Sequence, residues 1–158
     1  MTATLDLLGR AIATWFGCGY FPVAPGTAGS FAALMIALYV HSRFTWQSSW
    51  FGLLALLLFA PAVWAAGRTA ALSGSKDPGI VVVDEVVGQW ITLAGATSLN
   101  WKSWIGAFVL FRLFDIWKPP PVRRLERLRG GLGIVADDAM AGVYGSLVLF
   151  AAGWCNLY

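Results

Sequence analysis

The acidic residues of this 158-residue chain are few, and most of them lie beside long apolar segments. Only 8 Asp and Glu residues are present, with none between Ala11 and Lys76 or between Val86 and Phe114. A charged side chain is costly in an apolar environment, so acids that recur beside such segments are candidates for function. Six of the acids fall in three short clusters, which are Asp77, Asp84 and Glu85, then Asp115, then Asp137 and Asp138. We therefore expect the chemistry of the chain to lie at these clusters.

Five of these acids suit a site for a divalent metal ion. They come from three separate segments, and no histidine or cysteine accompanies them, so only oxygen atoms are offered as ligands. Hard oxygen ligands favour Mg²⁺ or Mn²⁺. We predict that one or two Mg²⁺ ions, or Mn²⁺ in their place, are bound by Asp84, Glu85, Asp115, Asp137 and Asp138.

Basic residues next to Asp115 could bind a phosphate near this metal. Arg112, Asp115 and Lys118 are spaced three residues apart, so they share part of one helical face. Arg can hold a phosphate through two N–H groups, whereas Lys acts as a point charge. A metal ion with two bases favours metal-assisted phosphoryl transfer to water, in which positioning and charge neutralisation supply most of the catalysis.

A Pro/Gly-rich segment at residues 19–30 opens the first long apolar segment. Thr27 or Ser30 could cap a helix that starts here, and the exposed backbone N–H groups of that helix would attract an anion. We therefore add Thr27 and Gly26 to the two bases as predicted contacts of the substrate phosphate.

Each pattern also has a purely structural interpretation. The Pro/Gly-rich segment could be a simple turn and cap, and Asp84 and Glu85 could be acids at the water boundary. Arg112 and Asp115 could form a structural ion pair, and Asp137 could cap a helix. Five acids from three segments on one side of the protein favour a shared site over four unrelated explanations.

The composition is that of an integral membrane protein. The chain is 58% hydrophobic and 12% charged, with a mean hydropathy of +0.69, whereas soluble domains carry about 25% charged residues. We expect an all-α, polytopic helical bundle that forms a single domain over residues 1–158, with an interfacial helix at residues 4–16 and no signal peptide. A span needs roughly 20 apolar residues, and the five predicted spans are about 28–42, 50–67, 82–99, 103–117 and 138–157.

Basic residues predict the orientation of these spans. Residues 118–129 carry five Lys and Arg, and short basic loops mark the cytoplasmic side of a membrane. Placing residues 118–129 in the cytoplasm puts every acid on the cytoplasmic side of the membrane. Loops 43–49 and 100–102 then face the opposite side and contain no acid. A one-sided polar region suits an enzyme acting at the inner leaflet better than a channel, which needs polar groups along its full depth.

A small cation- or proton-coupled carrier that uses the same acids is the alternative. It predicts polar or ionisable residues at mid-depth in several spans. The sequence offers there only Gln89, Thr92 and Ser146, with Arg112 nearer the inner end, and none of them is an acid, which argues against a carrier. We expect no nucleic-acid partner, because the net charge of +3 reflects membrane topology. The oligomeric state is left open.

The motifs resemble those of the phosphatidylglycerophosphatase A family, which consists of bacterial membrane phosphatases. The similar segments are residues 19–30, 77–93, 111–120 and 130–142, in the order and spacing of the family. The resemblance implies a Mg²⁺-dependent enzyme of the inner (cytoplasmic) membrane that acts on a phospholipid of the inner leaflet. That reaction hydrolyses the terminal phosphomonoester of phosphatidylglycerophosphate and gives phosphatidylglycerol and inorganic phosphate.

The resemblance does not assign the attacking group, which is either a water molecule or one of the aspartates; we favour water. Other phosphatase chemistries lack their residues. The single histidine, His41, falls at the outer end of the first predicted span, and neither cysteine is followed by an arginine six positions later. A histidine or cysteine nucleophile is therefore not expected.

Overall fold

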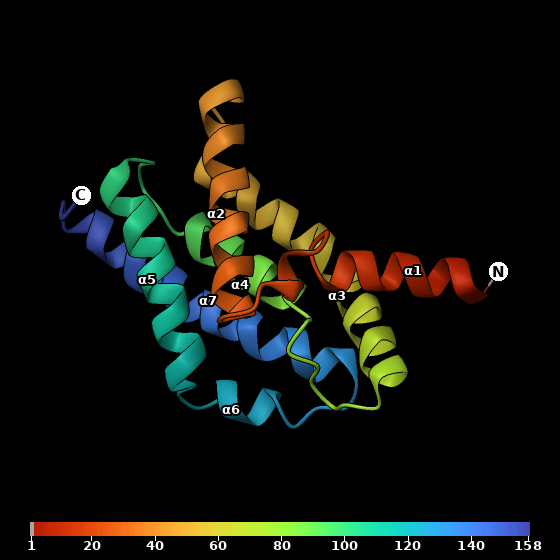
Figure 1. The fold of residues 1–158 in the computed structure, drawn as a ribbon. Helices are drawn as coiled ribbons and strands as arrows, with labels where there is room; N and C mark the ends of the chain where they lie inside the picture. The colour runs from red at the N-terminus through yellow and green to blue at the C-terminus, as the bar shows by residue number, and fades with distance from the viewer. Residues whose placement is uncertain (1) are drawn as a thin grey trace.

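A computed structural model describes residues 2–158, and within that range every regular element is a helix. Figure 1 shows the arrangement, with the two chain ends on opposite sides of the molecule. The all-α prediction is confirmed. The helices are α1 (Thr2–Ala13), the short 3-10 helix η1 (Cys18–Tyr20), α2 (Pro25–Phe44), α3 (Ser48–Ser73), α4 (Val83–Ala94), α5 (Trp101–Trp117), α6 (Val122–Leu125) and α7 (Gly131–Trp154).

Two of the described helices, α3 and α7, are long and apolar enough to cross a membrane. The five-span prediction is not confirmed. Its third span, residues 82–99, is wrong in length, because α4 has 12 residues and ends at Ala94. At 1.5 Å per residue α4 is about 18 Å long, which is shorter than a hydrocarbon core of about 30 Å. The chain turns at Gly95, and Asn100 caps the start of α5 through its side chain.

The short helix α4 lies in the middle of the bundle and contacts α2, α3, α5 and α7 (Figure 1). Its side chains are buried on nearly all sides, and the buried ones include the polar residues Asp84, Gln89 and Thr92. The indole of Trp90 donates a hydrogen bond to the carbonyl of Ala33 in α2, at 3.0 Å. The buried amide of Val82, just before α4, donates to the carbonyl of Ala13 at the end of α1, at 2.8 Å. The two bonds tie the second half of α4 to α2 and the residue before α4 to α1.

Small residues bring α4 and α7 into close contact. A Cβ added at Gly88 would lie 2.7 Å from the backbone oxygen of Asp138, and it would also overlap the ring of Phe111. A Cβ added at Gly142 would lie 3.0 Å from the Cα of Gly88. Glycine is therefore required at this crossing, and the crossing places the acids of α4 next to Asp138.

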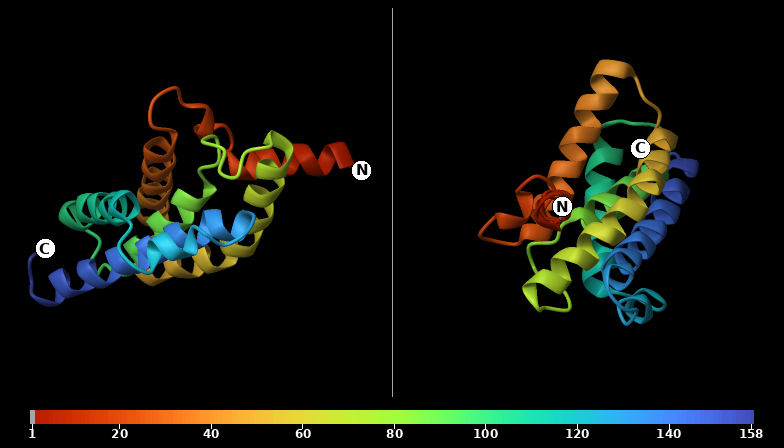
Figure 2. Two further views of the ribbon diagram at one scale, coloured as in Figure 1. Left: turned by 90° about the horizontal axis from the view of Figure 1, so that it is seen from below. Right: turned by 90° about the vertical axis from the view of Figure 1, so that its right-hand side faces the viewer.

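The N-terminal helix α1 packs against α3, and its N-terminal end extends beyond the other helices (Figure 2). Its leucines Leu5, Leu7 and Leu8 are exposed. An ion pair between Asp6 and the Nε of Arg68, at 2.6 Å, ties α1 to α3. The helix forms close to the range predicted for an interfacial helix, and its position at a membrane surface stays a prediction.

Candidate active site

A cavity of about 250 Å³ lies where the first turns of α2 and α4 meet the last turn of α5 and the first turns of α7. It gathers all five predicted metal ligands and both predicted phosphate-binding bases in one place. The lining residues are Pro25, Gly26, Asp77, Gly79, Val81, Asp84, Glu85, Arg112, Asp115, Lys118, Ile134, Asp137 and Asp138. The convergence of separate segments, on which the predicted site depends, is therefore present in the fold.

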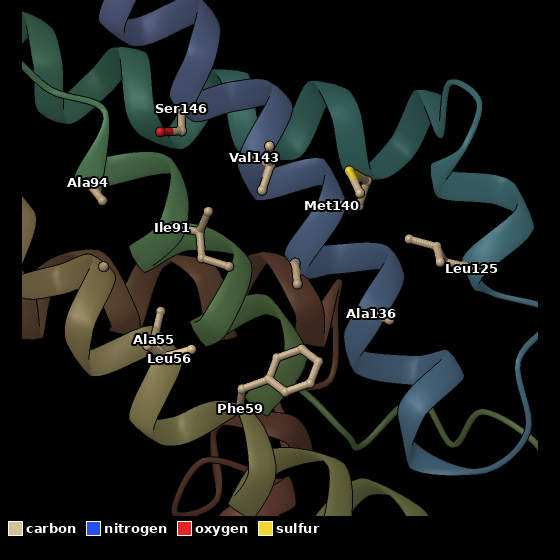
Figure 3. A pocket seen from close by; sticks show the side chains of 12 residues that line it. Ala55, Leu56, Phe59, Ile91, Ala94, Leu125, Ala136, Met140, Val143 and Ser146 are labelled. Carbon is tan, nitrogen blue, oxygen red and sulfur yellow. The ribbon is translucent and has the colours of Figure 1, made fainter.

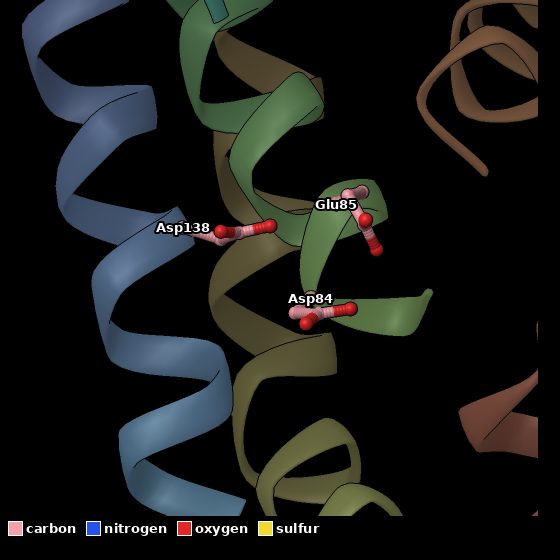
Figure 4. A group of neighbouring side chains, drawn as sticks. All are labelled: Asp84, Glu85 and Asp138. Carbon is pink, nitrogen blue, oxygen red and sulfur yellow. The ribbon is translucent and has the colours of Figure 1, made fainter. Parts of the chain in front are cut away.

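Three of the acids are close enough to share one ion. Carboxylate oxygens of Asp84, Glu85 and Asp138 all lie within 4.8 Å of one another. Figure 4 shows Asp138 on α7 beside the first turn of α4, which carries the other two. Asp84 is 8% exposed and Asp138 is 5% exposed. The chemistry of the trio, which is all oxygen and all negative, fits Mg²⁺ or Mn²⁺.

Buried carboxylate oxygens that lack hydrogen bonds also support a metal site. Asp84 Oδ1 and Glu85 Oε2 are buried and accept no hydrogen bond from any described residue. Buried carboxylates that lie side by side are strongly unfavourable, because each loses its hydration and repels the others. A divalent cation would supply the missing charge and the missing contacts at once.

The acids Asp115 and Asp137 line the same cavity but are paired with bases. Asp115 Oδ2 lies 2.8 Å from Arg112 Nη1, and Asp137 Oδ2 lies 2.6 Å from Lys118 Nζ. Asp137 Oδ1 is buried and has no hydrogen-bond partner within residues 2–158. The geometry thus separates a close trio of acids from two acids that hold the bases, and the metal-ligand role of the latter two stays a prediction.

Asp137 does not cap α7. The helix begins at Gly131 with Gly130 as its N-cap, so Asp137 lies in the second turn and the capping alternative is wrong. The glycines make this early start possible, since a Cβ at Gly131 would overlap the backbone of Val63 in α3. The glycine-rich stretch before Asp137 therefore forms the first turn of α7, which packs against α3.

Arg112 is placed to bind an anion inside the cavity. Its side chain is 19% exposed, and Nη1 lies 3.9 Å from Glu85 Oε1 in addition to its contact with Asp115. The buried Nε donates a hydrogen bond to no group in the described part of the chain. The guanidinium therefore retains a donor while two carboxylates hold it in position.

The start of α2 forms part of the cavity wall through Pro25 and Gly26. A Cβ added at Gly26 would overlap the carboxylate of Glu85 and would lie 3.4 Å from Arg112 Nη1, so any larger residue here would displace the Glu85 side chain. The predicted side-chain cap is wrong. Ala24 is the N-cap with φ +50°, and Ser30 lies inside the helix, donating to the carbonyl of Gly26 at 2.9 Å. Thr27 does not line the cavity, and its contact with phosphate stays a prediction.

Asp77 and Gly79 also line the cavity but were not among the predicted site residues. Asp77 was recognised as a clustered acid, and the Asp-Pro-Gly sequence that contains it was a sign of a turn. Val81 N donates to the carbonyl of Pro78 at 2.9 Å, which closes that turn and directs the chain toward α4. The Asp-Pro-Gly turn signature is the sequence feature from which Asp77 could have been predicted as a site residue.

A larger groove of about 530 Å³ between α3, α4 and α7 contains no titratable lining residue (Figure 3). Ala136 and Met140 line it from α7, and Ile91 lines it from α4. Asp138 is two residues from both Ala136 and Met140, about 200° around the helix, so Asp138 lies on the face of α7 opposite to these two residues. The chemistry is therefore confined to the smaller cavity.

The ammonium of Lys118 remains charged because of its neighbours. Burial alone would lower the pKa of Lys118, but the hydrogen bond to Asp137 and the charges of Asp137 and Asp138 outweigh it and raise the pKa above the ordinary value of 10.5. A lysine with a raised folded-state pKa stabilises the fold fully below its unfolded pKa and loses that contribution as the pH rises through the folded value.

Lys118→Met is therefore expected to lower the free energy of unfolding by about 1–3 kcal/mol, because Asp137 keeps its buried carboxylate without a partner. The loss should be the same from pH 7 to pH 9 and should shrink only above about pH 10.5. Denaturation in detergent across this range measures it. Lys76→Met is the matched control, since Lys76 makes only an exposed 3.3 Å contact to the carbonyl of Glu126. Equal losses of unfolding free energy in both variants would contradict a stabilising pair between Lys118 and Asp137.

A family model and two of the relatives found in comparisons with known proteins carry the same description. The model of the family described as phosphatidylglycerophosphatase A matches residues 11–153. A protein named phosphatidylglycerophosphatase A from Escherichia coli is 39% identical over 144 residues, covering 90% of this chain and 81% of the relative. The protein of the same name from Haemophilus influenzae is 39% identical over 141 residues, covering 89% and 85%.

A third relative carries a different name. It is a putative phosphatidylinositol-3-phosphatase from Bacteroides thetaiotaomicron, 44% identical over 150 residues and covering 90% of this chain and 92% of its own length. No solved structure matches the chain.

Proposed function

The chain belongs to the phosphatidylglycerophosphatase A family, and on this premise we propose that it hydrolyses phosphatidylglycerophosphate to phosphatidylglycerol and inorganic phosphate with the help of Mg²⁺. The observation that carries the proposal is the buried trio of Asp84, Glu85 and Asp138 beside Arg112, in a cavity lined by groups that fit a metal ion and a phosphate. The family makes the chain a phosphoric monoester hydrolase, and the substrate and metal are the proposal.

Each residue of the cavity has a distinct proposed role. Asp84, Glu85 and Asp138 would hold one Mg²⁺, and Asp115 and Asp137 would be the additional ligands if a second ion binds. A bound divalent cation would neutralise the oxygens of the phosphoryl group. Arg112 binds the same group through its N–H donors, and Lys118 adds a positive charge at the cavity wall.

Arg112 and Lys118 are held by Asp115 and Asp137 before substrate arrives. This preorganisation matters because phosphoryl transfer depends mainly on positioning and charge. Water attacks the terminal phosphorus, the bond from phosphorus to the glycerol oxygen breaks, and the lipid leaves as an alcohol. An acid-quenched reaction that traps phosphate on Asp84 or Asp137 would contradict attack by water.

The proposed location is the bacterial inner membrane, with several spans and the cavity on the cytoplasmic side. The basic residues of segment 118–129 support this side, and the two membrane-capable helices α3 and α7 support an integral protein. The substrate then enters from the inner leaflet.

Phosphatidylinositol 3-phosphate is the second candidate substrate, favoured by the name of the relative from Bacteroides thetaiotaomicron. Both lipids present a phosphomonoester on a headgroup, so the same cavity chemistry serves either. We propose phosphatidylglycerophosphate because the family model and two relatives name it.

Phosphate release from each lipid in detergent micelles tests the function. With Mg²⁺ we expect release from phosphatidylglycerophosphate, and with excess chelator we expect that release to fall to background, because the acid trio repels phosphate once the cation is gone. Release that survives chelation would exclude the metal-dependent mechanism. Ion movement across vesicles without phosphate release would favour the carrier alternative.

A further inference from the structure

We propose that a basic pocket next to the catalytic cavity binds the phosphodiester of the lipid headgroup, and so makes the enzyme prefer lipids that carry a diester and a monoester together. The pocket has a volume of about 190 Å³ and is lined by Trp117, Lys118, Pro119, Pro120 and Arg123. The inference rests on the proposed function, since it names the second recognition element of the same substrate.

The pocket adjoins the cavity through one side chain. Lys118 lines both spaces, and its Nζ contacts Asp137 on the cavity side at 2.6 Å. A ligand with two anionic groups joined by a short polyol could therefore place one group in each space, with the ammonium of Lys118 between them.

The turn after α5 is what brings Arg123 to this place. α5 ends at Trp117, and the amide of Val122 donates to the carbonyl of Pro119 at 2.8 Å, which folds the chain back on itself. The hydroxyl of Tyr144 in α7 donates to the carbonyl of Pro120 at 2.8 Å. The pocket is thus built on a turn that is anchored to the helix carrying Asp137 and Asp138.

The charges around the pocket suit an anion. No acid is among its lining residues, and Arg123 forms no ion pair with an acid of the described chain within 4.0 Å, whereas Arg112 and Lys118 do. Arg123 is exposed and can present two N–H groups to the two free oxygens of a phosphodiester. Trp117 is 62% exposed, and indoles favour the headgroup level of a bilayer, which is where the phosphodiester of a lipid lies.

This arrangement distinguishes two kinds of lipid phosphate. Phosphatidylglycerophosphate carries a phosphodiester followed by a glycerol and a terminal phosphomonoester. Phosphatidic acid carries a phosphomonoester alone, attached directly to diacylglycerol, so nothing in it reaches the second pocket when its phosphate is in the cavity. Arg123 is therefore expected to be a specificity residue for diester-containing headgroups.

The test compares Arg123→Ala with Arg124→Ala, which removes the same charge from the next residue, outside both spaces. With Mg²⁺ in mixed micelles, Arg123→Ala should raise the KM for phosphatidylglycerophosphate about tenfold with little change in kcat, because a charge-assisted contact is lost. Hydrolysis of phosphatidic acid should stay within about twofold, and Arg124→Ala should resemble the wild type with both lipids. Arg123→Lys should recover only part of the loss, because an ammonium cannot bind bidentately.

Inhibition by phosphatidylglycerol gives a second measurement, since this product retains only the diester. Its inhibition constant should rise in Arg123→Ala and not in Arg124→Ala, whether or not phosphatidic acid is a substrate. Equal effects of the two variants, or equal effects on the two lipids, would overturn the second pocket. A wild-type protein that releases no phosphate from phosphatidylglycerophosphate would instead overturn the proposed function, so the two failures are distinguishable.

Discussion

Asp84→Asn and Asp138→Asn are each expected to lower phosphate release from phosphatidylglycerophosphate by at least about 100-fold, while making the metal-free protein more stable. Both carboxylates are buried, and both belong to a group of three whose oxygens lie within 4.8 Å of one another. Replacing one carboxylate by an amide of the same shape removes a metal ligand and also removes a buried charge that repels its neighbours. Activity and metal-free stability should therefore change in opposite directions.

Thermal unfolding in detergent separates this result from simple damage to the fold. In chelator, each Asn variant should unfold at a higher temperature than the wild type. Added Mg²⁺ should raise the Tm of the wild type by binding the folded state and should raise that of the variants much less. Two variants that are both inactive and less stable in chelator would show that the acids are structural.

Lys102→Ala is the control for this pair. Lys102 lies at the start of α5, at the end of that helix away from the cavity, and its Nζ makes only a 3.4 Å contact to the carbonyl of Leu157. Its removal should leave phosphate release nearly unchanged. A large loss there would contradict both the site and the proposed orientation in the membrane.

Arg112→Ala is expected to lower kcat/KM by about 100- to 1,000-fold, which is the usual effect of removing a preorganised donor from a developing anionic charge. Arg112 contacts Asp115 at 2.8 Å and lies 3.9 Å from Glu85. Its loss would therefore also free two carboxylates to repel the phosphate. The steady-state rate with saturating Mg²⁺ measures the effect.

Two further variants identify the cause of that loss. Arg112→Lys should restore little activity, because the planar guanidinium and not the charge alone fits both the carboxylate and the phosphate. Arg43→Ala, at the far end of α2 from the cavity, removes the same charge and should be nearly silent. Full activity in Arg112→Lys would show that a positive charge alone is sufficient.

Much of the fold and of the site followed from the sequence, because this apolar chain offers few places for a charge. The predicted spans at 28–42 and 50–67 lie inside α2 and α3, and the predicted span at 103–117 lies inside α5. The five acids and two bases were identified by their position beside apolar segments, and all seven line one cavity. Burial of charge is so costly that clustered acids in such a chain indicate a shared site.

The predicted spans were wrong at helix ends that depend on packing between helices. α4 stops at Ala94 and α7 starts at Gly131, and neither boundary follows from hydropathy. A Cβ at Gly95 would lie 2.6 Å from the hydroxyl of Ser146, so the turn after α4 depends on its close approach to α7. Such backbone contacts between distant segments leave no local pattern in the sequence.

The sequence by itself determined which side chains could do chemistry, because residue type and an apolar surrounding are local properties. Only the tertiary structure decided how those side chains are grouped. The crossing of α4 and α7 at Gly88 sets Asp138 beside Asp84 and Glu85, while Asp115 and Asp137 pair with Arg112 and Lys118. The same turn that ends α5 places Arg123 next to the cavity. Distances between residues far apart in the chain are set by how closely the helices pack, and a list of residues does not contain them.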